Sequence, residues 1–272
     1  MINIIGLGAG SYEELTLEAC RTLKNGNRNF TRTKETEAIK YFEIENIPYI
    51  SFDDYYEDAE SFDEVYKKIV STLLEEEKSG DINYSVPGHP LVAERTVRIL
   101  IESGVEYKII SGLSFIEPTL NIVKKDISEG FILLDALEIS DLMIDPKKHV
   151  IITQVYNERI LSDMKLLLSS IYGDEYEVYL VVDAGLESES GKKLKIEDLD
   201  RGHFVNHRTC LFIPKSDIKT ILDLEKILKE VEVDESLEEI SDEFMTIWNK
   251  IRVGNRYGYW EMSEIFDKIS KK

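Results

Sequence analysis

Short apolar runs alternate with helical patterns along the first half of the chain. Apolar runs at 2–7, 81–86 and 107–110 stand next to glycine, proline or serine, which indicates buried β-strands. Apolar residues then recur at three- and four-residue steps, most clearly over 61–77, and predict amphipathic helices. Further helices are predicted at 16–24, 91–103 and from the turn at 111–114 to residue 121. The alternation of strand, turn and helix predicts a mostly parallel α/β sheet.

The alternation continues in the second half of the chain. Strands are predicted at 131–134, 150–155, 177–182 and 210–213, and a helix at 158–171. The stretch 187–195 is polar and charged, so we expect a hairpin turn or an exposed loop there.

Two successive sets of strands indicate two α/β units rather than one barrel. We place the first unit at 1–112 and the second at 113–216. Strand signals stop beyond these units, and the patterns over 217–272 predict a helical tail.

Charge and composition exclude several classes of partner. The 272 residues carry a formal charge of −20, from 33 Lys and Arg against 53 Asp and Glu. No cluster of four or more basic residues offsets this charge, so we expect neither nucleic acid nor a membrane as a partner. The two cysteines, Cys20 and Cys210, form no disulfide framework or zinc motif. No apolar run reaches the roughly 18 residues that span a bilayer, and no signal-peptide pattern is present. These features predict a cytoplasmic protein.

A glycine run follows the first predicted strand. It reads Gly6-x-Gly8-x-Gly10 and is followed by Leu15-Thr16. Glycines at the end of a strand allow a sharp turn and the close approach of a ligand. A dinucleotide fingerprint would place its third glycine where Ser11 stands, so that interpretation is weak. A tight strand-to-helix turn without a ligand is the alternative.

Two more glycine loops follow predicted strands. The first, at 84–92, contains Pro87-Gly88-His89-Pro90, and the second, at 110–115, contains Gly112 and Ser114. Ligands of open α/β sheets bind at the carboxyl ends of strands, near helix N-termini. A surface histidine and a helix-capping serine are the ordinary interpretations of these side chains. Three such loops in one chain favour a shared binding site.

Metal binding has little support in the sequence. His203 and His207 are four residues apart, but the residues between them do not indicate a helix and no third ligand is evident. We therefore predict no metal site.

Together, the three loops resemble those of the tetrapyrrole (corrin/porphyrin) methylase superfamily. The resembling motifs are Gly6-x-Gly8-x-Gly10 with Leu15-Thr16, then Val86-Pro87-Gly88-His89-Pro90-Leu91, then Gly112-Leu113-Ser114. Further stretches, including Arg32-Thr33-Lys34 and 130–136, resemble in particular the methylase domain of YabN-type proteins, where a MazG-type nucleotide pyrophosphohydrolase follows. The resemblance covers about residues 1 to 225. It implies the two-domain tetrapyrrole-methylase (class III methyltransferase) fold.

The resemblance also implies a function and a set of site residues. The implied cofactor is S-adenosyl-L-methionine, the implied partner a small-molecule methyl acceptor, and the implied assembly a homodimer. Cofactor contacts would fall on Gly8, Ala9, Gly10, Gly88, His89, Val92, Ser114, Phe115, Gln154, Ala184 and His207. No catalytic residue can be assigned; Tyr84, Glu94 and Arg95 are candidates for a general base only because they lie near the second loop. Arg32 and Lys34 could attract an acidic acceptor, or could be ordinary surface cations.

Two departures from the family keep other functions open. The segment 25–30 is polar where the family has an apolar second strand, and the tail lacks the paired acidic helices of MazG, so we expect that part to be truncated or diverged. The alternatives to a methyltransferase are a degenerate fold that senses cofactor or binds partners, and a nucleoside triphosphate pyrophosphohydrolase. The latter would use the acidic residues of the tail, Glu238, Glu239, Asp242 and Glu243.

Overall fold

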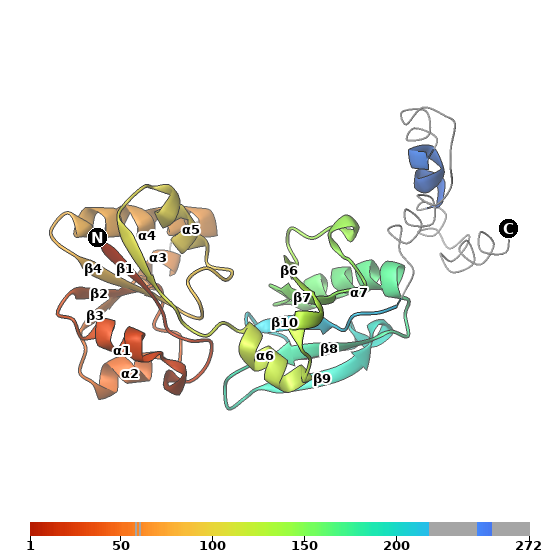
Figure 1. The fold of residues 1–272 in the computed structure, drawn as a ribbon, viewed down its shortest axis with the longest axis horizontal. Helices are drawn as coiled ribbons and strands as arrows, with labels where there is room; N and C mark the ends of the chain where they lie inside the picture. The colour runs from red at the N-terminus through yellow and green to blue at the C-terminus, as the bar shows by residue number, and fades with distance from the viewer. Residues whose placement is uncertain (58, 60, 218–243, 252–272) are drawn as a thin grey trace. The chain divides into compact units, whose positions relative to one another are not determined.

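The computed structural model describes residues 1–57, 59, 61–217 and 244–251. The chain divides into two compact units, each described here by itself (Figure 1). The first comprises Met1–Lys125 with Val181–Gly191, and the second comprises Asp126–Leu180 with Lys192–Lys272. The first unit therefore includes helix α6 (Ile116–Val123) and a segment that returns from the second half of the chain.

The first unit is built on a five-stranded sheet in the order β3-β2-β4-β1-β5. Its strands are β1 (Ile2–Gly6), β2 (Arg28–Thr31), β3 (Tyr49–Ser51), β4 (Ile82–Val86) and β5 (Tyr107–Ile110). Each neighbouring pair is parallel. The carboxyl ends of all five strands therefore share one edge, and the runs predicted at 2–7, 81–86 and 107–110 are confirmed as strands.

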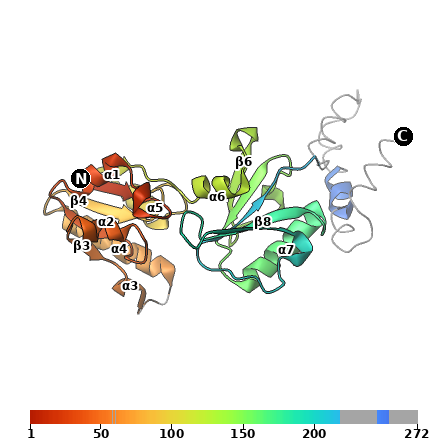
Figure 2. The same ribbon diagram turned by 90° about the horizontal axis from the view of Figure 1, so that it is seen from below.

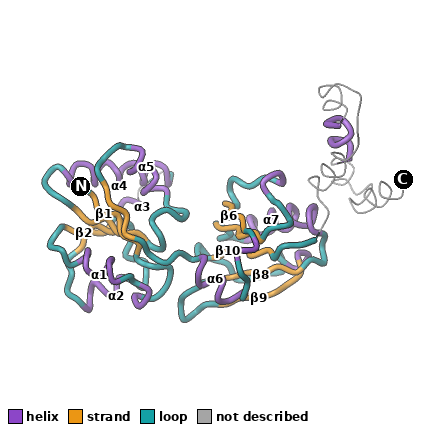
Figure 3. Tube along the Cα trace, in the orientation of Figure 1, coloured by secondary structure: helices purple, strands orange, loops and turns teal. Residues whose placement is uncertain are grey.

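Helices cover both faces of this sheet (Figures 1 and 3). One layer contains α1 (Leu17–Leu23) and α2 (Ile39–Ile44), and the other contains α3 (Asp54–Glu57), α4 (Phe62–Glu77) and α5 (Arg95–Glu102). Strand β1 is apolar on both faces of the sheet. Ile2 and Ile4 belong to the core under α4 and α5, and Ile5 belongs to the core under α1 and α2. Parallel strands buried on both faces are continuously apolar for this reason.

Helix α4 forms where the sequence predicts it. The side chain of Ser61 caps its N-terminus by accepting from the backbone N–H of Glu64, and Val65, Ile69 and Leu73 are buried along one stripe. Helix α5 begins only at Arg95, so the prediction of a helix from residue 91 is wrong at that end. Residues 87–94 form a loop that turns through Ala93 at φ 55°, a left-handed conformation that no α-helix tolerates.

The polar character of the second strand has a structural cause. Asn29 of β2 lies opposite Asn83 of β4, which lies opposite Asn3 of β1. The Nδ2 of Asn3 donates to Oδ1 of Asn83 at 2.9 Å, and Nδ2 of Asn83 donates to Oδ1 of Asn29 at 2.9 Å. All three side chains are buried. The three-asparagine ladder therefore replaces apolar packing on this part of the sheet, and each amide satisfies its neighbour.

A second, mixed sheet has the order β6-β7-β10-β8-β9 and belongs to the second unit, apart from the end of β8 and the start of β9. The strands are β6 (Phe131–Asp135), β7 (His149–Thr153), β8 (Glu177–Val182), β9 (Ser190–Lys195) and β10 (Thr209–Ile213). Strand β7 pairs parallel with β6 and antiparallel with β10. Helix α7 (Glu158–Tyr172) covers one face, burying Leu161, Met164 and Leu168 (Figure 2).

The prediction of a hairpin turn or exposed loop at 187–195 is wrong for residues 190–195, which form strand β9. Its first four residues are exposed and include Lys192 and Lys193, so nothing in its sequence shows the alternation of a half-buried strand. It lies at the edge of the sheet, where charged side chains are common because they discourage further strand pairing.

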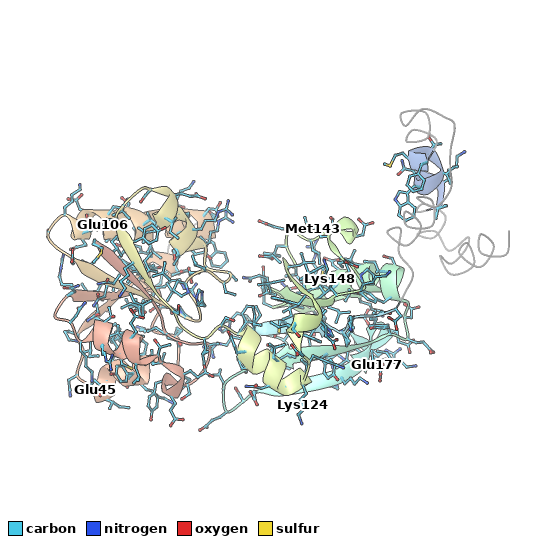
Figure 4. The ribbon with its side chains drawn as sticks, in the orientation of Figure 1. Glu45, Glu106, Lys124, Met143, Lys148 and Glu177 are labelled. Carbon is cyan, nitrogen blue, oxygen red and sulfur yellow. The ribbon has the colours of Figure 1, made fainter. Side chains whose placement is uncertain are left out.

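The remaining expectations concern the surface and the tail. Neither Cys20 nor Cys210 is part of a disulfide. Among the described residues no helix has the length and apolarity needed to cross a bilayer. Charged side chains such as Glu45, Glu106, Lys124, Lys148 and Glu177 lie on the surfaces of the two units (Figure 4). Of the predicted helical tail, residues 244–251 are helical, and residues 218–243 and 252–272 lie outside the described residues.

Candidate functional site

The three glycine loops meet at the carboxyl edge of the first unit's sheet. A Cβ placed on Gly6 would lie 2.6 Å from the backbone O of Gly88 and 2.6 Å from the backbone N of Gly112. A Cβ placed on Gly112 would lie 2.5 Å from the same carbonyl O of Gly88. Only hydrogen fits in these spaces, so the three backbones are in direct contact. The three loops therefore lie together at this edge, and that they form a shared binding site stays a prediction.

Two hydrogen bonds join the first loop to the second. The N–H of Gly88 donates to the carbonyl of Gly8 at 2.7 Å, and the N–H of Gly8 donates to the carbonyl of Gly88 at 3.4 Å. Both glycines have positive φ, 83° for Gly8 and 71° for Gly88. These two hydrogen bonds join the loops through their backbones, in conformations that favour glycine.

The returning segment touches the glycine run. A Cβ placed on Gly10 would lie 2.0 Å from the carbonyl O of Gly185, so these two backbones are also in contact. Ala184 next to it is buried. This brings Ala184 into the same unit as Ala9 and Gly10, although they are far apart in sequence.

One side chain of this region has no sequence signal. Glu14 closes the short helix η1 (Tyr12–Glu14), and its Oε2 accepts from the N–H of Gly10 at 2.8 Å. In the sequence it is one of two adjacent glutamates with no pattern to distinguish it. Its carboxylate holds the glycine run in its turn.

The predicted contact residues of the second and third loops are themselves bonded within their loops. Nδ1 of His89 accepts from the N–H of Leu91 at 3.1 Å, which leaves Nε2 to carry the proton of the neutral ring. The N–H and hydroxyl of Ser114 both donate to Oε2 of Glu117, at 2.8 and 2.6 Å. Phe115, rather than Ser114, is the residue that precedes the first turn of α6.

The predicted contact residues fall in both units. Nine of them, Gly8, Ala9, Gly10, Gly88, His89, Val92, Ser114, Phe115 and Ala184, belong to the first unit. Gln154 and His207 belong to the second, where Gln154 follows β7 at φ 64° and His207 lies exposed before β10. Ala93, Gln154 and Asp183 all have positive φ just after strands or in their loops. Such strained residues concentrate at binding sites.

Each of the three candidates for a general base already has a hydrogen-bond or ion-pair partner within the protein. The hydroxyl of Tyr84 is fully buried against Thr96, and burial, then the charge of Glu94, raise its pKa well above the ordinary value. Glu94 forms an ion pair with Arg32, and Arg95 forms one with Asp63. None of the three is a free base.

No group of three or more His, Cys, Asp and Glu among the described residues could hold a metal ion. His203 instead lies with Nε2 2.9 Å from the carbonyl of Asp198 and Nδ1 3.2 Å from Nζ of Lys192. The acidic residues of the tail at 238–243 lie outside the described residues.

The loop after β2 is braced by Asp53. Its carboxylate accepts from the hydroxyls of Ser51 and Thr33 and from the N–H of Lys34. Burial raises the pKa of Asp53. The three hydrogen bonds lower it by more than burial raises it, so its pKa lies below the ordinary 3.8. The brace fixes the segment Arg32–Thr33–Lys34 at the carboxyl edge of the sheet.

We expect Asp53→Asn to lower the free energy of unfolding at pH 7 by about 1–2 kcal/mol, because charge-assisted hydrogen bonds are lost. Since the pKa of Asp53 is depressed by folding, its contribution is complete above the unfolded pKa and is lost as pH falls through the folded pKa. Urea unfolding from pH 7 to pH 2.5 measures this. The difference between wild type and variant should shrink below about pH 4; a difference constant with pH contradicts the assignment.

Comparison with known proteins supports one family. The model of the tetrapyrrole (corrin/porphyrin) methylases matches residues 1–200. The protein YabN of Bacillus subtilis, described as uncharacterized, is 30% identical over 100% of this chain. The chain spans 64% of that relative's length.

Solved structures share the fold at low identity. Uroporphyrin-III C-methyltransferase from Thermus thermophilus, complexed with S-adenosylhomocysteine, is 16% identical, with a TM-score of 0.57 over 78% of this chain and 91% of that one. A putative diphthine synthase from Entamoeba histolytica is 14% identical, with a TM-score of 0.59 over 83% and 97%. The predicted fold is thereby confirmed, and the chain belongs to the family of tetrapyrrole (corrin/porphyrin) methylases.

Proposed function

We propose that the protein is an S-adenosylmethionine-dependent methyltransferase acting on a small-molecule acceptor. The observation that carries the proposal is the backbone contact of three glycine loops at the carboxyl edge of a parallel sheet. Such edges are where open α/β folds bind ligands. Loops fixed largely by backbone contacts suit a ligand that is held by main-chain groups.

The residues present fit that cofactor. Gly88 turns at φ 71°, and a Cβ built on it would reach only the carbonyl O of Leu113, at 4.0 Å. That side of the turn is therefore open, whereas Gly6 and Gly112 have no room for a Cβ at all. Gly8, Gly10, Gly88 and Ala184 would hold the cofactor by backbone, and Nε2–H of His89 would be available as a donor.

When bound, S-adenosylmethionine supplies an electrophilic methyl group on a good leaving group, so the reaction needs neither a metal nor a covalent nucleophile. The chain's part is alignment, which can contribute up to about 7–11 kcal/mol. The rigid loops serve this role, because backbone contacts leave them little freedom. Tyr84, Glu94 and Arg95 have structural partners, so the proposal assigns no residue to proton removal.

The test is calorimetric titration with S-adenosylhomocysteine of the wild type and of two alanine variants. We expect one site per chain with a micromolar Kd, and we expect Gly88→Ala to weaken binding about tenfold or more, equivalent to about 1.4 kcal/mol. The added methyl group enters the open side of the turn.

Gly104→Ala is the matched control. Gly104 has φ 78°, close to that of Gly88, and a Cβ there meets nothing within 4 Å, next to the C-terminus of α5. Both variants therefore carry similar backbone strain, of about 1 kcal/mol, and only Gly88→Ala should lose affinity. Equal losses in both variants would trace the effect to stability. Absence of binding to the wild type at millimolar ligand would favour a fold that has lost its cofactor.

A further inference from the structure

A second cluster of polar side chains lies at the same edge of the first unit's sheet. Arg32 directly follows β2, Tyr84 belongs to β4, and Glu94 and Thr96 stand at the start of α5. Tyr56 of α3 and Tyr66 of α4 pack against the core beside them. The motif Arg32-Thr33-Lys34, which resembles the YabN-type methylases, thus contributes its first residue to a defined cluster.

Glu94 is fixed by a directed chain of hydrogen bonds. The hydroxyl of Thr96 donates to Oε1 of Glu94 at 2.6 Å, so the hydroxyl of Tyr84, 2.7 Å from that of Thr96, must donate to it. The other oxygen, Oε2, lies 3.2 Å from Nε of Arg32, and the Glu94 side chain is only 6% exposed. Glu94 therefore presents a buried, oriented carboxylate to Arg32.

Arg32 has hydrogen-bonding capacity that these neighbours do not use. Its Nε is buried and faces Oε2 of Glu94 without a hydrogen bond of ordinary geometry to any described residue. The Arg32 side chain as a whole is still 26% exposed, so part of it reaches the surface. A guanidinium carries five N–H donors in a planar fork. Glu94 is its ionic partner among the described residues, and it engages the Nε side.

The charge of the cluster limits what can bind there. Burial lowers the pKa of Arg32, but Glu94 and the nearby tyrosines raise it more, so the guanidinium is charged at every accessible pH. The next cation on α5, Arg95, already pairs with Asp63. The planar fork matches the two oxygens of a carboxylate. A carboxylate adds one negative charge to the Arg32–Glu94 pair and a dianionic phosphate adds two, so repulsion by the buried Glu94 disfavours the phosphate more.

Two tyrosines, Tyr56 and Tyr66, lie near the Arg32 guanidinium, and Phe62 packs against both of them. Phe62 is 67% exposed at the start of α4, its ring is stacked on Tyr66 with centroids 6.2 Å apart, and Tyr56 lies 6.3 Å from it. An exposed phenylalanine between two partly buried tyrosines offers apolar surface to a flat ligand. The cluster thus pairs a planar cation with an aromatic wall.

The loop that carries Glu94 also carries the proposed cofactor turn. Glu94 is separated from Val92 only by Ala93, whose φ of 55° turns the chain, and the N–H of Arg32 donates to the carbonyl of Ser85 on β4 at 2.9 Å. Asp53 braces the residues that follow Arg32. The cluster is therefore anchored to the same strand and loop as Gly88.

We propose that Arg32, oriented by Glu94, binds a carboxylate group of the methyl acceptor, with the aromatic wall of Tyr56, Phe62 and Tyr66 against the acceptor's apolar part. This inference rests on the proposed function for the identity of the ligand as acceptor. Glu94 is then a positioning residue, and Arg32 contributes binding and specificity rather than chemistry.

The experiment uses 2-naphthoate as probe and 2-naphthamide as its neutral isostere, titrated into the full chain and followed by NMR. In the wild type, naphthoate should bind at least about tenfold tighter than naphthamide, and it should shift the side-chain Nε–H resonance of Arg32. Arg32→Lys keeps a cation beside Glu94 but loses the planar fork, so naphthoate should weaken about tenfold. Lys34→Met removes a charge from the same loop and should change its affinity less than about twofold.

The outcomes separate this inference from the proposed function. Equal affinity of the two probes, or an unmoved Arg32 resonance, would overturn the carboxylate site even if Arg32→Lys failed to fold. An equal loss in Arg32→Lys and Lys34→Met would also overturn it, because it would indicate attraction by general charge. S-adenosylhomocysteine binding is measured on the same samples. Cofactor binding without probe discrimination defeats only this inference. Discrimination without cofactor binding defeats the proposed function, and with it the identity of the ligand as a methyl acceptor, while the carboxylate site itself stands.

Discussion

Replacing Gly112 with alanine is expected to lower the free energy of unfolding by about 3 kcal/mol or more, because the added methyl group has no space. Its Cβ would lie 2.5 Å from the carbonyl O of Gly88, and 2.6 and 2.8 Å from the carbonyl C and O of Gly6. These contacts are backbone atoms at the ends of β1 and β4, so relief requires the strands or their loops to separate. Urea unfolding followed by circular dichroism measures the loss.

Gly26→Ala is the control that isolates the cause. Gly26 has φ 87°, which alanine adopts only with strain, yet a Cβ there meets nothing within 4 Å. Gly112 has no such positive φ. If conformational freedom decided the cost, Gly26→Ala would be the more damaging variant; the contact geometry predicts the reverse, with a loss of only about 1 kcal/mol at Gly26. The same displacement of loops should abolish S-adenosylhomocysteine binding in Gly112→Ala and leave it intact in Gly26→Ala.

The strands and long helices of this fold could be predicted because their burial shows in the sequence itself, as continuous apolar runs in strands and as apolar stripes in helices. The apolar run at 2–7 and the stripe through Val65, Ile69 and Leu73 depend only on neighbours in sequence. The start of α5 could not be predicted, since Leu91 and Val92 continue an apolar spacing and only the left-handed turn at Ala93 breaks it. Strand β9 was missed because an exposed edge strand has no alternation to detect.

The candidate site also has some features that neighbouring residues predict and others that depend on the tertiary fold. That three glycine loops share one edge could be inferred from the parallel order of strands. The ion pair of Arg32 with Glu94 and the brace of Asp53 could not, because each joins residues that only the sheet order β3-β2-β4 brings together. The register is equally absent from the sequence, and it explains the polar second strand because it places Asn29 opposite Asn83.

That register leads to the second large effect, at Asn83. We expect Asn83→Val to lower the free energy of unfolding by about 3–5 kcal/mol, because it removes the partner of two other buried amides. The substitution leaves Nδ2 of Asn3 and Oδ1 of Asn29 without the 2.9 Å bonds that now satisfy them. It also removes a donor from the carbonyl of Thr22. Valine is a good strand residue, so the loss cannot be assigned to strand propensity.

A double-mutant cycle with Asn3 gives this prediction its sharpest form. The amide of Asn3 donates to Asn83 across the sheet and is buried, so Asn3→Val alone should destabilise the protein by about 1–2 kcal/mol. In the Asn83→Val background the same substitution removes an amide that has already lost its partner, so it should raise stability instead. A change of sign between the two backgrounds, measured by urea unfolding, identifies the ladder as a coupled network. Simple addition of the two losses would mean that each asparagine acts alone and that the register between β1 and β4 does not explain the polar strand.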